Sequence, residues 1–100
     1  MKKVFAILFI SFLFSNDDDL LSKTTRAIEY KKYKEALEYI IKAEDSNQKN
    51  PDFFRLKALI YEMLDEADQA KEAWKMCYKY SKDINMKREA KIHIQNLSNN

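Results

Sequence analysis

The stretch ALEYIIKA at residues 36–43 returns 34 residues later as AKEAWKMC at residues 70–77. In both copies a small residue is followed four positions later by a bulky apolar residue, and three positions further by another small residue. These positions share one face of a helix, where the small residues let a second helix approach and the bulky one fills the space between them. We therefore expect two copies of one packing unit, built on Ala36, Ile40 and Ala43 and on Ala70, Trp74 and Cys77.

The same spacing extends to the segment before each stretch, where it pairs Leu20 with Phe54, Thr24 with Ala58, and Ala27 with Tyr61. No segment alternates apolar and polar residues as a strand would. Asn50 and Pro51 form a typical helix start, and Asp65 is a candidate cap for the next helix. The pattern predicts an all-α fold with five helices, at about residues 20–30, 33–45, 51–64, 67–81 and 85–97. The second helix is expected to bury Tyr33, Leu37 and Ile41 beside its small-bulky-small positions.

A period of about 34 residues built from two helices resembles the tetratricopeptide repeat (TPR) family. The resemblance places repeats at about residues 20–50 and 51–82, and a capping helix at about 85–97. It implies antiparallel helix-turn-helix repeats that bind other proteins rather than catalyse reactions. The residues that carry it are Ala36, Ile40, Ala43, Phe54, Ala58, Tyr61, Ala70, Trp74 and Cys77.

The first fifteen residues have the order of a bacterial secretory signal. Lys2 and Lys3 precede a run from Val4 to Phe14 that is apolar except for Ser11, and Ser15 could occupy the cleavage position. Such a run spans about 16 Å as a helix, against roughly 30 Å for a bilayer core. We predict a signal peptide at residues 1–15 and a TPR-like domain at 16–100. A buried core helix is the alternative, although it should show a polar face.

The charge balance argues against nucleic acid as a partner. The chain has 18 Lys and Arg and 16 Asp and Glu, and loss of Lys2 and Lys3 with the signal would leave sixteen of each. Residues 16–70 hold nine basic and thirteen acidic side chains, whereas residues 71–100 hold seven and three. The mature chain is therefore expected to be neutral but dipolar, which can steer a partner without identifying it.

The usual catalytic and metal-binding patterns are missing from the sequence. Without any glycine the chain has no glycine-rich loop to hold a phosphate. His93 is the only histidine and has no Cys, His or carboxylate cluster around it in sequence. Cys77, the only cysteine, occupies a small-residue packing position, so we favour a buried thiol over an intermolecular link. We expect neither an enzyme nor a bound metal or cofactor.

In proteins of the TPR kind the first helix of each repeat lines a concave groove, and the resemblance places partner-binding residues there. Leu56, Leu59 and Met63 form an apolar stripe at i, i+3 and i+7, apart from the predicted core stripe. The alternative is that the terminal helix or a second copy of the chain covers this stripe. The predicted groove residues are Leu21, Ser22, Thr25, Ile28 and Glu29 in the first repeat, and Asp52, Arg55, Leu56, Leu59, Glu62 and Met63 in the second.

A basic ridge is also predicted along the fourth helix, at Lys71, Lys75, Lys79 and Lys82. It could contact an acidic partner or anionic lipid, but plain solvation of an outer face explains it as well. Together these features predict a periplasmic or secreted adaptor that binds a peptide or helix of another protein. The resemblance suggests an accessory of an envelope complex, such as one that assembles outer-membrane proteins. The rival hypothesis is a self-associating structural protein whose groove is closed by another copy.

Overall fold

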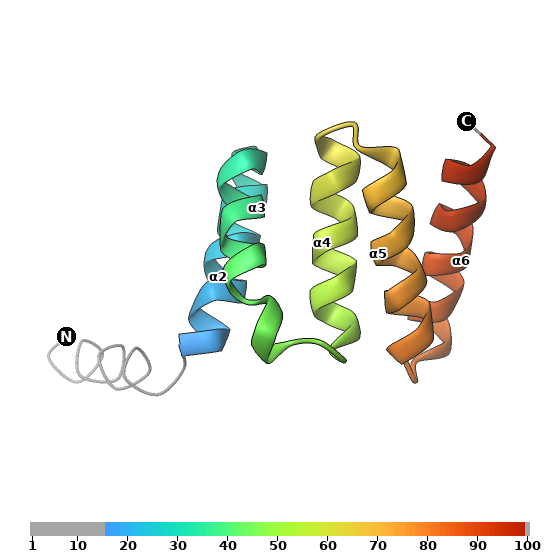
Figure 1. Ribbon diagram of the computed structural model, residues 1–100, viewed down its shortest axis with the longest axis horizontal. Helices are drawn as coiled ribbons and strands as arrows, with labels where there is room; N and C mark the ends of the chain where they lie inside the picture. The colour runs from blue at the N-terminus through green and yellow to red at the C-terminus, as the bar shows by residue number, and fades with distance from the viewer. Residues whose placement is uncertain (1–15, 100) are drawn as a thin grey trace, which may run out of the picture.

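The computed structural model describes residues 16–99, which form five α-helices and one short 3-10 helix (Figure 1). Residues 16–99 contain no strand, so the prediction of an all-α fold with five helices is confirmed. The predicted signal peptide lies outside the described residues. The elements are α2 (Asn16–Glu29), α3 (Tyr33–Lys42), η1 (Glu44–Ser46), α4 (Pro51–Met63), α5 (Ala67–Tyr80) and α6 (Ile84–Ser98).

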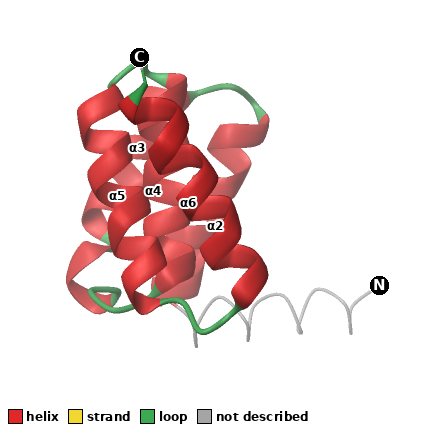
Figure 2. Ribbon diagram, turned by 90° about the vertical axis from the view of Figure 1, so that its right-hand side faces the viewer, coloured by secondary structure: helices red, strands yellow, loops and turns green. Residues whose placement is uncertain are grey.

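The helices form two antiparallel hairpins, α2 with α3 and α4 with α5, and α6 packs against α5 (Figure 1). The contact between α4 and α5 is the most extensive, whereas the contact between α3 and α4, which joins the hairpins, is much smaller. Viewed from the side of α6, α5 lies on the left and α2 on the right (Figure 2). The second hairpin and α6 therefore form the more tightly packed part of the fold.

A residue in the left-handed conformation closes each hairpin. Lys31 has a φ of 61° and Asp65 a φ of 62°, so the 34-residue period recurs in the backbone. The amide of the following residue donates to a carbonyl oxygen five positions back, at 2.8 Å in both turns. Glycine usually takes this position because other residues meet a steric cost there. The expectation that Asp65 caps the following helix is wrong: Asp65 lies in the turn after α4, and the residue that precedes α5 is Glu66, which makes no side-chain cap hydrogen bond.

Side-chain caps fix the starts of α4 and α6. The side chain of Asn50 accepts a 3.0 Å hydrogen bond from the amide two residues on, and Pro51 occupies the first turn of α4. Asp83 caps α6 in the same way at 2.9 Å. The helix therefore begins at Ile84, one residue before the predicted start, because the Asp83 carboxylate satisfies a free amide of its first turn.

Most of the predicted repeat-core residues are buried. Ala36, Ile40, Ala58, Ala70, Trp74 and Cys77 have no exposed surface, and Ala43 and Phe54 have very little. Four of the residues predicted to be buried are not: Ile41 is exposed, and Tyr33, Leu37 and Tyr61 are only half-buried. Ile41 is 53% exposed, because neighbours on a helix point about 100° apart and Ile40 occupies the inward direction. Tyr61 is only half-buried, because one side of it faces a cavity that it lines.

Candidate functional site

An open hollow lies along α2, where the sequence predicted the groove of the first repeat. Its volume is about 470 Å³, and Leu21, Ser22, Thr25 and Glu29 line it together with Arg26. Four of the five lining residues are thus positions that the sequence assigned to partner binding. Ile28, also predicted there, is half-buried and packs against the core instead. The hollow combines one apolar side chain with hydroxyl groups and one charge of each sign, so its chemistry suits a polar or amphipathic segment.

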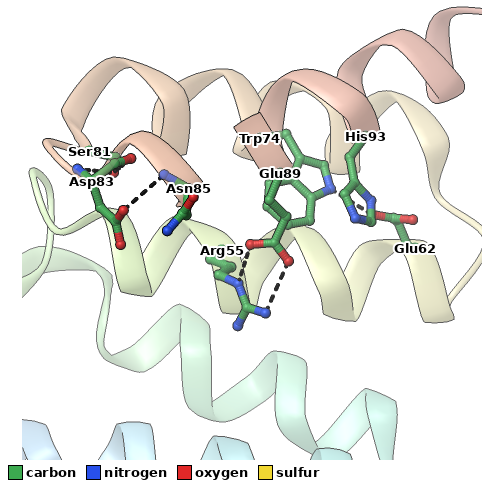
Figure 3. Close-up of polar contacts among 8 residues, drawn as sticks. All are labelled: Arg55, Glu62, Trp74, Ser81, Asp83, Asn85, Glu89 and His93. Carbon is green, nitrogen blue, oxygen red and sulfur yellow. Dashed lines mark hydrogen bonds and ion pairs between the residues drawn. The ribbon is translucent and has the colours of Figure 1, made fainter. Parts of the chain in front are cut away.

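The charged residues of the α4 face are engaged within the chain. Arg55 makes two hydrogen bonds to Glu89 of α6, at 2.8 and 3.0 Å (Figure 3). The bonded guanidinium holds the pKa of the Glu89 carboxyl below its usual range, and the carboxylate raises the pKa of Arg55. Both side chains remain about one third exposed. This bidentate pair links α4 to α6, so the Arg55 guanidinium is already paired within the chain.

Glu62 is the acceptor at the centre of a second link between helices. Its Oε2 accepts from Trp74 Nε1 at 2.5 Å and lies 2.7 Å from Nδ1 of His93 (Figure 3). The rings of Trp74 and His93 stack with centroids 4.2 Å apart. One carboxylate therefore joins α4, α5 and α6. The role of His93 could not be predicted from local sequence, because Glu62 and Trp74 lie 31 and 19 residues before it.

The apolar stripe of α4 is divided between core and surface. Leu56 and Leu59 are half-buried and pack against the core, so the prediction that the core does not need them is wrong. Met63 remains 56% exposed, and Asp52 is exposed as well. The terminal helix covers part of this face, as the alternative hypothesis stated, because α6 bonds to Arg55 and Glu62 of α4. The accessible part of the predicted site is therefore the α2 hollow and Met63 at the far end of α4.

The Arg55–Glu89 pair predicts a loss of stability in acid. Because the pKa of Glu89 is lowered in the folded state, the pair stabilises the protein above the ordinary carboxyl pKa of about 4.3 and ceases to do so as the pH falls through the lower folded value. Glu89→Gln should cost about 1 kcal/mol at pH 7, since the pair is partly exposed. The difference in the free energy of unfolding between Glu89→Gln and the unaltered chain should shrink below pH 4. Urea unfolding at pH 7 and pH 3 measures it, and an equal difference at both would contradict the ion-pair explanation.

A second concave region, which we call the α4–α5 cleft, was not predicted. Two adjoining cavities of about 310 and 430 Å³ share Phe54, Lys57 and Met76. The sequence signal was the apolar series Ala73, Met76 and Tyr80 at i, i+3 and i+7 on α5, beside the core stripe. The first cavity is also lined by Tyr61, Asp68, Gln69, Glu72 and Ala73, and the second by Glu44, Gln48, Lys49 and Tyr80.

The lysine ridge and Cys77 are weak candidates for a binding or reactive site. Lys75, Lys79 and Lys82 are exposed, with Lys75 in a long 3.5 Å contact to Glu72. Burial raises the pKa of the Cys77 thiol to about 11, which keeps it protonated and weakly nucleophilic at neutral pH. Within residues 16–99, no three His, Cys, Asp or Glu side chains are grouped so that they could hold a metal ion. Over the same described range, no helix has the length and apolar character needed to cross a membrane.

Comparison of the chain with protein-family models, with curated proteins and with solved structures gives no match.

Proposed function

We propose that the chain is a protein-interaction module of the TPR kind, which binds a segment of a partner protein along α2. The observation that carries the proposal is the hollow of about 470 Å³ on α2, lined by Leu21, Ser22, Thr25, Arg26 and Glu29. All of these residues except Arg26 are positions that the resemblance to the TPR family assigns to the groove. Its hydroxyl groups can pair with a peptide backbone, while Arg26 and Glu29 can orient charged side chains of the partner.

The environment in which the module works follows from the order of residues 1–15. We propose export across the inner membrane and action as an adaptor in the cell envelope, for example as an accessory of a complex that assembles outer-membrane proteins. The basic start, the apolar run from Val4 to Phe14 and Ser15 support this.

Export predicts a defined mature mass. We expect cleavage between Ser15 and Asn16, because a small residue there follows the apolar run. Intact-mass spectrometry of the protein recovered from the native cell should show a chain that begins at Asn16. A full-length chain retained in the inner membrane would contradict the signal peptide.

Filling the α2 hollow should abolish partner binding without loss of fold. Ser22 and Thr25 are both exposed, so the double variant Ser22→Arg/Thr25→Arg should melt within a few degrees of the unaltered chain, as surface substitutions usually do. Affinity purification of the tagged chain from the native envelope, after cross-linking, identifies the partner. We expect the partner to be enriched with the unaltered chain and lost with the double variant.

Asn96→Arg provides a control for an added surface arginine, since it places one positive charge at an exposed position of α6. It should retain the partner. If the double variant retains the same proteins as the control, the α2 hollow is not the binding site.

A further inference from the structure

The α4–α5 cleft has the composition of a helix-docking site. Its floor is apolar, formed by Phe54, Tyr61, Ala73 and Met76, while charged side chains stand at its two ends. Asp68 and Glu72 stand at the end near the start of α5, and Lys49 stands at the opposite end. Lys57 is already paired with Glu44 at 2.8 Å. The cleft therefore presents an acidic end and a basic end to an incoming segment.

The outer face of α6 carries a matching pattern. Ile84 is 70% exposed and Ile92 49% exposed, and the two lie eight residues apart with Arg88 midway between them. Lys91 is also exposed beside Ile92, whereas Asp83 is exposed beside Ile84. The face thus has two apolar anchors and a basic end formed by Arg88 and Lys91, while at its other end Asp83, which also caps α6, lies beside Lys82. It lies away from the contacts that α6 makes with α4 and α5.

We propose that the α4–α5 cleft binds the outer face of α6 from a second copy of this chain. Ile92 enters the cavity beside Asp68 and Glu72, with Arg88 and Lys91 facing those carboxylates. Ile84 enters the cavity beside Lys49, with Asp83 near that lysine. The docked helix runs antiparallel to α5, because this direction places Arg88 and Lys91 against Asp68 and Glu72.

The spacing of the two apolar anchors is close to that of the two cavities. Ile84 and Ile92 are about 12 Å apart along the helix at 1.5 Å per residue. On α5 the two cavities span residues 68–76 and 76–80, so their midpoints are about 9 Å apart.

The contact is heterologous, since the cleft and the α6 face are different surfaces. It can close into a ring or continue as a chain of copies, depending on the rotation between neighbours. The contact does not involve the α2 hollow, so a test that contradicts this proposal would leave the proposed function unaffected. Ser22→Arg/Thr25→Arg should accordingly leave the assembly unchanged.

Charge reversal between copies tests the proposal. The full chain is studied by sedimentation equilibrium over a range of concentrations at low salt, where the unaltered protein should show masses above that of one chain. Glu72→Lys and Arg88→Glu should each weaken assembly roughly tenfold or more, because each places like charges against one another. An equal mixture of the two variants should restore assembly, since both contacts between unlike chains again join opposite charges.

Glu38→Lys is the matched control, as it makes the same change at the equivalent exposed position 34 residues earlier on α3. It should leave the mass distribution unaltered. Circular dichroism melting should confirm that every variant is folded. A single-chain mass at all concentrations overturns the proposal. Assembly that Glu72→Lys does not weaken also overturns the proposal. Assembly that is weakened by Glu72→Lys but not by Arg88→Glu overturns it as well, because the cleft would then bind another segment or another protein.

Discussion

Trp74→Ala is expected to lower the free energy of unfolding by about 3–5 kcal/mol. The side chain has no exposed surface, so its removal leaves a large cavity between α4, α5 and α6. The substitution also removes the indole N–H that donates to Glu62 and the ring on which His93 stacks. Small domains have a total stability of only about 5–15 kcal/mol. We therefore expect Trp74→Ala to be largely unfolded at 37 °C by circular dichroism.

Lys75→Ala serves as the control for this prediction. Lys75 is the next residue on α5 but is exposed, and its 3.5 Å contact with Glu72 is a surface ion pair of small value. Its unfolding midpoint in urea should match that of the unaltered chain. Equal midpoints for Trp74→Ala and Lys75→Ala would mean that Trp74 is not the centre of the core.

Phe53→Ala should have an effect of similar size, about 3–5 kcal/mol. Phe53 has no exposed surface, whereas Phe54 is 7% exposed and lines both cavities of the α4–α5 cleft. Removal of Phe54 enlarges a space that is already open to solvent, so Phe54→Ala should cost less. Urea unfolding of both variants measures the order. A larger loss for Phe54→Ala would favour the original sequence pattern, which assigned Phe54 and not Phe53 to the core.

Local features of the chain were predicted well from the residues alone. The spacing of Ala36, Ile40 and Ala43 against Ala70, Trp74 and Cys77 placed six buried positions correctly. The asparagine and proline at residues 50–51 marked the start of α4. Such features depend on neighbours three or four residues away on the same helix, and a short stretch of sequence contains all of them.

The candidate site was predicted less completely. Leu21, Ser22, Thr25 and Glu29, which were predicted to line a groove, line the α2 hollow, and their contact with a partner stays a prediction. On α4, by contrast, Arg55 and Glu62 looked like free flanking charges, yet they bond to Glu89 and His93 of α6. These pairs span 34 and 31 residues, and nothing in the local pattern distinguishes a charge that faces solvent from one that meets another helix.

The residues of this chain therefore specify five helices, their turns and a 34-residue period, because helix formation and the alignment of an apolar face are governed by short-range spacing. They leave open which of two adjacent apolar residues is buried, as with Ile40 and Ile41. The packed arrangement resolves these choices. The rotation of each helix about its axis and the small contact between α3 and α4 determine which side chains meet, and they leave a cleft open beside α4 and α5. The rotation of each helix and the extent of the contact between α3 and α4 depend on all the helices packing together, so neither can be deduced from a single segment.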